Sequence, residues 1–69
     1  MTLAQKLNEL RTTKKLSYRA AAAGIGISVS TLHEIEHGAM PRLNTAASMA
    51  KFYEVTLEEL AAHVEGGQA

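Results

Sequence analysis

The chain has 69 residues, enough for one small domain and too few for a second hydrophobic core. Hydrophobic residues make up 46% and aromatic residues 4%, which indicates a folded domain with an aliphatic core and excludes a natively disordered chain. The net charge is zero, and the absence of cysteine excludes disulfides and thiolate zinc sites and is typical of a cytoplasmic protein.

The first predicted helix begins after Thr2. Thr2 and Gln5 have the spacing of a capping box, in which each side chain bonds the backbone N–H group of the other residue. Leu3, Leu7 and Leu10 then recur at helical spacing. The two threonines that follow Arg11 mark the end of this helix.

A second helix is predicted from its N-cap, Ser17, through a run of alanines to Gly24. The next residues, Gly-Ile-Gly-Ile-Ser at 24–28, place two glycines around an apolar residue and predict a sharp turn. Ser28 then caps a third, short helix over 28–37, which Gly38 ends at the position after its C-cap.

Two more helices complete an all-α chain. One is expected from Leu43 to Tyr53, after the loop closed by Pro41, and another opens at a second capping box, 56–59, and runs to about His63. We expect one domain over 1–65 and a frayed tail over 66–69. The inward positions predicted for the fourth helix are Leu43, Ala46, Ala47, Ala50 and Tyr53.

Charge is unevenly distributed despite the neutral total. Residues 1–19 hold five basic side chains and one acidic one, whereas residues 54–69 hold four glutamates and no lysine or arginine. Such asymmetry fits an interaction surface as well as two ordinary solvated faces, and both readings stay open.

A helix, a short glycine turn and a second short helix led by polar residues form the pattern of a helix-turn-helix unit. A wider match runs from Leu3 to Leu60, on Leu16-Ser17, Ala22, Ile25-Gly26-Ile27-Ser28, Ser30-Thr31, Ile35-Glu36, Gly38, Pro41, Leu43, Ala50-Lys51 and 55–60. On these residues the chain resembles the Cro and phage-repressor type of helix-turn-helix domain, which is also called XRE-like or lambda-repressor-like. The resemblance implies a compact five-helix bundle whose third helix, 28–37, lies in the major groove of DNA.

The resemblance also implies roles for single residues. Val29, Ser30, His33 and Glu34 stand where similar domains address base edges. Val29 can pack on a thymine methyl group and His33 can donate to guanine or to phosphate. Glu34 either accepts from a cytosine amino group or is a solvated surface residue.

Other residues between Lys14 and Asn44 are expected to contact the sugar-phosphate backbone of DNA. Lys14, with Lys15, is either such a contact or a solvated loop residue. Arg11 and Glu36 correspond to an ion pair that ties the recognition helix to the scaffold. The residues expected to contact the DNA backbone are Lys14, Tyr18, Arg19, Ser28, Thr31, Arg42 and Asn44.

Three residues depart from the pattern of similar domains. Tyr18 stands where glutamine is common, which weakens its implied phosphate contact. Ala21 replaces a larger apolar residue and indicates a closer approach of the second helix to the core. Glu54 replaces a glycine and leaves open how the fourth helix ends.

Metal binding and catalysis are not expected. His33 and His37 lie four residues apart on one helix, but no third ligand has suitable spacing. No set of nucleophile, base and oxyanion donors can be assembled either. We therefore expect no cofactor and no enzymatic activity.

The expected function is sequence-specific binding of duplex DNA by a transcriptional regulator, a repressor that binds an inverted-repeat operator as a homodimer. A protein-interaction module of the same fold, such as an antitoxin, is the alternative, with or without autoregulatory DNA binding. With no apolar span of membrane-crossing length and no signal segment, no membrane association is expected. Dimer contacts are expected at Val55, Leu57, Leu60, Ala61 and Val64, which are equally suited to the core.

Overall fold

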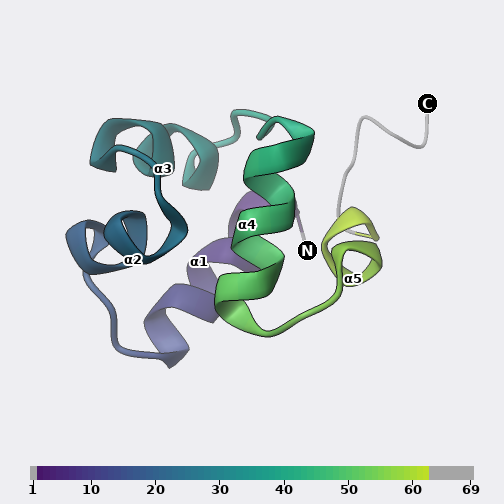
Figure 1. Ribbon diagram of the computed structural model, residues 1–69, viewed down its shortest axis with the longest axis horizontal. Coiled ribbons are helices and arrows are strands. Elements are labelled where there is room, and N and C mark those ends of the chain that lie inside the picture. Colours follow the sequence, from purple (N-terminus) through teal and green to yellow (C-terminus); the bar gives the residue numbers. More distant parts are fainter. Residues whose placement is uncertain (1, 63–69) are drawn as a thin grey trace.

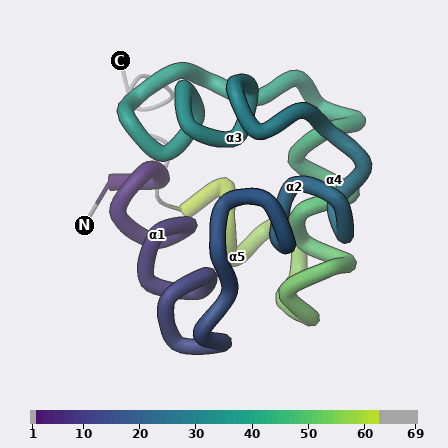
Figure 2. The backbone as a smooth tube through the Cα atoms, turned by 90° about the vertical axis from the view of Figure 1, so that its left-hand side faces the viewer, coloured from purple at the N-terminus to yellow at the C-terminus, as the bar shows by residue number. Residues whose placement is uncertain are grey.

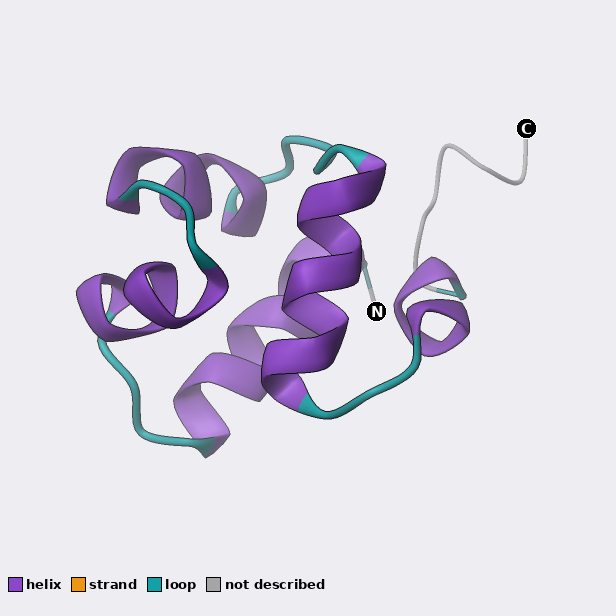
Figure 3. Ribbon diagram, in the orientation of Figure 1, coloured by secondary structure: helices purple, strands orange, loops and turns teal. Residues whose placement is uncertain are grey.

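The computed structural model describes residues 2–62, which form helices joined by turns (Figure 1). Within that range there is no strand (Figure 3), so the all-α, five-helix prediction is confirmed. The end of the domain at 65, the tail and Val64 lie outside the described residues. The helices are α1 (Leu3–Thr13), α2 (Tyr18–Ile25), α3 (Val29–Glu36), α4 (Leu43–Tyr53) and α5 (Leu57–Ala61).

Four of the helices begin at a hydroxyl side chain. The oxygen of each accepts a hydrogen bond from the backbone N–H group three residues later, which satisfies a group that has no partner inside the helix. Thr2 and Gln5 form the predicted capping box. At Thr56 only the hydroxyl bond, from the Glu59 N–H group, is present, so the second capping box was wrong. The four caps are Thr2, Ser17, Ser28 and Thr56.

Left-handed backbone conformations end α2, α3 and α4. Gly26 has φ of 94° and Gly38 has φ of 114°, which glycine adopts without a Cβ clash. Glu54 ends α4 with φ of 59° and ψ of 41°. Glu54 therefore adopts the left-handed conformation that a glycine would adopt here. The Glu54 side chain makes this conformation cost about 1 kcal/mol.

Gly24 lies inside α2 and not in the turn that follows, which corrects the predicted boundary. A Cβ atom at Gly24 would clash with Cε1 of Phe52 on α4. The absence of a side chain thus allows α2 and α4 to pack closely, and the turn itself depends on Gly26.

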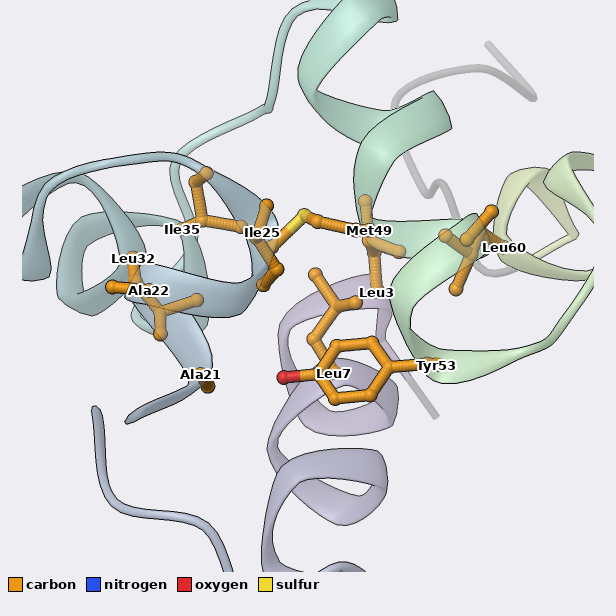
Figure 4. Packing of buried hydrophobic residues seen from close by; sticks show 11 residues of the cluster. Leu3, Leu7, Ala21, Ala22, Ile25, Leu32, Ile35, Met49, Tyr53 and Leu60 are labelled. Atoms are coloured by element: carbon orange, nitrogen blue, oxygen red, sulfur yellow. The ribbon is translucent and has the colours of Figure 1, made fainter. Parts of the chain in front are cut away.

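All five helices contribute side chains to one core (Figure 4), and α2 packs against both α3 and α4 (Figure 2). Ala21 on α2 is fully buried in this core. Leu32 and Ile35 fix the inner side of α3, so the residues between them face outward. The buried hydrophobic residues are Leu3, Leu7, Ala21, Ala22, Ile25, Leu32, Ile35, Met49, Ala50, Tyr53 and Leu60.

The inward face of α4 differs from the prediction at three positions. Leu43 is 75% exposed and Ala47 is exposed, whereas Met49, which was not predicted, is completely buried. Leu43 lies in the first turn of α4, at the edge of the bundle, where little of the core remains to cover it. Leu43 therefore adds apolar surface to the outside of the molecule.

Candidate functional site

The α2–turn–α3 unit presents one side of α3 to solvent. Ile27, in the turn, packs against the core and fixes where α3 begins. Val29 is 41% exposed, and Ser30, His33 and Glu34 are exposed as well. The four residues predicted to address base edges thus share the outward face of one helix, which is 8 residues long.

The hydroxyl groups at the start of α3 have different roles. Ser28 Oγ accepts from the Thr31 backbone N–H group at 3.1 Å and donates to Thr31 Oγ1 at 2.9 Å. Ser28 is therefore occupied mainly by capping, whereas the Thr31 hydroxyl keeps its own proton for another acceptor. Ser30, for which no side-chain hydrogen bond is present within residues 2–62, offers both a donor and an acceptor.

A hollow of about 370 Å³ separates α3 from the segment that leads into α4. Thr31 and Glu34 line it from α3 and Arg42 from the other side. Arg42 is also the N-cap of α4, a position without a side-chain hydrogen bond, so the first N–H groups of α4 are left uncapped. Asn44 is exposed in the same first turn.

The remaining residues expected at the DNA backbone are placed as follows. Arg19 is exposed in the first turn of α2, next to Tyr18. Lys14 and Lys15 are exposed in the turn between α1 and α2, at the bottom of the view in which α3 lies at the top (Figure 1). The structure thus brings Tyr18 and Arg42 to α3 but leaves Lys14 farther away.

Arg11 and Glu36 form a buried ion pair between α1 and α3, as the resemblance implies. Arg11 Nε donates to Glu36 Oε2 at 2.9 Å and to Oε1 at 3.2 Å, and Asn8 Nδ2 donates to Oε1 at 3.0 Å. The hydrogen bond to Glu36 raises the pKa of Arg11 above its ordinary value. A second Arg11 nitrogen donates to the Leu16 carbonyl oxygen at 2.8 Å, so one guanidinium joins α1, the next turn and α3.

The Tyr18 ring packs against the Arg11 guanidinium. Arg11 Cζ is 4.0 Å from the centroid of the Tyr18 ring, a cation–π contact. The Tyr18 ring centroid is 5.4 Å from that of His33 on α3. Tyr18 is half-buried. Sequence reasoning did not predict this packing role, because its two partners lie on two other helices.

His37, which was not predicted as a DNA-contacting residue, is stacked on His33 with ring centroids 4.0 Å apart. The rings are nearly parallel, so their nitrogens do not converge on one point between them. Within residues 2–62 there is no group of three or more side chains that could hold a metal ion.

Tyr53 is buried below the ion pair. Its hydroxyl has no hydrogen-bond partner among the described residues. Burial, together with the negative charge of Glu36, raises the pKa of Tyr53 to about 12. The phenol is thus kept neutral in the folded chain.

The residues expected at a dimer interface differ in how much of each is exposed to solvent. Leu60 is only 3% exposed and is part of the core of a single chain, while Val55 packs partly against that core. Leu57 is 39% exposed and Ala61 is exposed. Sequence reasoning missed Met40, which is 59% exposed.

Met40, Leu43 and Leu57 surround a hollow of about 340 Å³ whose lining is almost entirely apolar. We call these three residues the apolar patch. Within residues 2–62 no helix combines the length and the apolar character that crossing a membrane requires.

Comparison with known proteins agrees with this geometry. Residues 7–60 match a family described as helix-turn-helix, and the match includes α2, the turn and α3. A similar curated protein is the cryptic phage CTXphi transcriptional repressor RstR of Vibrio cholerae. It is 36% identical over 61 residues, which cover 87% of this chain and 55% of the relative. The chain therefore spans about half the length of that relative.

Proposed function

The chain belongs to the helix-turn-helix family of Cro and phage-repressor type domains, and on that premise we propose that it is a sequence-specific transcriptional repressor. The observation that carries the proposal is the exposed face of α3. Core packing and a buried ion pair fix the inner side of this helix, while Val29, Ser30, His33 and Glu34 remain accessible. A short polar helix held in this way fits the major groove of B-form DNA.

The side chains on that face offer different kinds of base readout. Ser30 can donate to or accept from a base edge, Val29 can pack on a thymine methyl group, and His33 can donate to guanine. Glu34 shares its hollow with Arg42. A nearby cation reduces the repulsion between the Glu34 carboxylate and phosphates and leaves it available to a cytosine amino group.

Phosphate contacts are proposed on both sides of α3. Arg19 stands at the N-terminus of α2, and Arg42 stands at the uncapped N-terminus of α4. Exposed backbone N–H groups and the helix dipole favour an anion at such positions, and each arginine adds a charge-assisted hydrogen bond. Thr31, Asn44 and Ser28 supply neutral donors. The Thr31 hydroxyl proton is available to phosphate, whereas that of Ser28 is donated to Thr31. Tyr18 and Lys14 complete the proposed set.

We place the dimer contact at the apolar patch instead of at Leu60. Met40, Leu43 and Leu57 are large apolar side chains that folding leaves partly in water, and burial of each against a second copy contributes about 1–2 kcal/mol. Ala61 lines the same hollow, Val55 packs partly against the core, and Val64 lies outside the described residues. Leu43→Glu is expected to give a folded monomer in sedimentation velocity. If the Leu43→Glu variant stays a folded dimer, the interface does not include the apolar patch.

Selection from a randomised duplex pool tests the function. With the full chain at fixed salt, the expected result is an enriched inverted repeat with half-sites about one helical turn apart. Affinity for the selected duplex should fall steeply with salt. Two arginines and one lysine bound to phosphate in each chain predict a slope of log K against log salt of about −5 for a dimer.

The alternative, a module that binds only another protein, makes the opposite prediction. Such a domain would enrich no motif at any salt concentration. Its residual DNA binding would not discriminate between duplexes of different sequence. Recovery of no motif by the full chain would therefore end the repressor proposal and favour a protein partner.

A further inference from the structure

Four side chains from three helices form a continuous stack that runs from the scaffold to the exposed face of α3. The Arg11 guanidinium lies 4.0 Å from the centroid of the Tyr18 ring. The Tyr18 ring lies 5.4 Å from the His33 ring, tilted by 56°, and the His33 ring lies 4.0 Å from the His37 ring at an angle of 21°. The His33 ring is therefore in contact with two other rings.

Both ends of the stack are fixed by hydrogen bonds. At the inner end Arg11 is bound by the Glu36 carboxylate and by the Leu16 carbonyl oxygen. At the outer end His37 Nδ1 lies 2.7 Å from the His33 carbonyl oxygen, a contact in which Nδ1 donates. The ring of His37 is thus held against α3 at the point where the helix ends.

These contacts limit the freedom of an exposed side chain. An exposed histidine normally exchanges among staggered rotamers within nanoseconds, and one rotamer must be selected when it binds a partner. Because the His33 ring contacts two other rings, its choice of rotamers is narrowed before DNA arrives. A pre-organised side chain binds with a smaller loss of entropy, and it distinguishes ligands by their geometry.

We propose that Tyr18 and His37 are positioning residues that hold the His33 imidazole in place to read one base pair of the operator. The inference rests on the proposed function. It assigns Tyr18 a stacking role in addition to its proposed phosphate contact, and it adds His37 to the specificity-determining residues. Neither ring needs to contact a base.

The test compares His37→Ala with His37→Phe, and Tyr18→Ala with Tyr18→Phe. Each full-length variant is titrated against the selected duplex and against duplexes with single base-pair changes, and His33→Ala identifies the position that His33 reads. Both alanine variants should lose about three- to tenfold in discrimination at that position. The phenylalanine variants retain a ring and should restore most of it.

A second measurement needs no DNA. In NMR spectra of the free chain, His37→Ala should shift the ring-proton resonances of His33, because the neighbouring ring current is removed, while thermal unfolding monitors the fold of every variant. Unchanged His33 resonances, or an equal loss of affinity for all duplexes, would overturn the inference.

The two proposals fail in different ways. If the wild-type chain selects no motif, the repressor proposal fails and the positioning role falls with it. If the wild-type chain selects a motif that His37→Ala reads with undiminished discrimination at every position, only the positioning role is refuted.

Discussion

Glu36→Gln tests the attachment of α3 to the scaffold most sharply. In the wild type both carboxylate oxygens face donors: Oε1 accepts from Asn8 and Arg11, and Oε2 accepts from Arg11. A glutamine amide must therefore turn its NH₂ group toward one of these donors in either orientation. The substitution removes at least one hydrogen bond and leaves the buried Arg11 charge unbalanced.

The expected loss of unfolding free energy is about 3 kcal/mol, since removal of one partner from a buried pair typically costs about 3–5 kcal/mol and the amide retains one acceptor. A domain of this length is stable by roughly 3–10 kcal/mol. The loss corresponds to a fall in Tm of about 12–24 °C.

Glu9→Gln is the matched control. Glu9 pairs with Lys6 at 3.6 Å on the exposed side of α1, and loss of such a pair costs less than about 0.5 kcal/mol. Urea unfolding followed by circular dichroism gives both free energies. Equal effects of the two substitutions would refute the structural role of the buried pair. The double variant Arg11→Met with Glu36→Leu should recover most of the stability, because no unpaired charge remains.

Gly24→Ala should destabilise the chain by about 1–2 kcal/mol in urea unfolding, because the Phe52 ring must move away from the new methyl group. Phe52→Leu in the same chain should relieve the loss, and a stabilised single variant would contradict the close packing. Tyr53→Phe should raise stability at pH 7 by about 1 kcal/mol, because a buried hydroxyl without a partner is removed. Because burial raises the pKa of Tyr53 from 10 to about 12, ionisation of the phenol opposes folding: the stability of the wild type is unaffected by this group below pH 10 and falls by about 2 kcal/mol as the pH rises from 10 to about 12. Tyr53→Phe should lack that loss, and identical alkaline unfolding of both proteins would refute the assignment. Ser30→Ala should relax preference at one base position, whereas Arg19→Ala should weaken binding to all duplexes and reduce the salt slope by about one per chain; equal loss of specificity from both would contradict these roles.

Local sequence signals were sufficient for the order of the helices and for most of their caps. The hydroxyl caps Thr2, Ser17 and Ser28 act on backbone groups three residues away, so their roles can be read from spacing alone. Gly38 adopts the left-handed conformation expected of it for the same reason. The exposed face of α3 follows from Leu32 and Ile35, whose spacing identifies the buried side.

Features that depend on distant parts of the chain could not be predicted in this way. The function of Gly24 is set by Phe52, 28 residues later, and appears only when α2 and α4 are packed. The alanine-rich sequence of α4 permits several apolar stripes, so the burial of Met49 and the exposure of Leu43 could not be separated. The ring stack around His33 depends on side-chain orientations from three helices.

The central claim is that the outward face of α3 lies against DNA. Because the chain has no cysteine, Ser30→Cys on α3 and Lys51→Cys on the last turn of α4 each provide a single reactive thiol. Maleimide labelling is measured with and without the selected duplex. DNA bound to the outward face of α3 should protect the thiol at position 30 and leave that at position 51 reactive. Protection at position 51 with full reactivity at position 30 would contradict the claim.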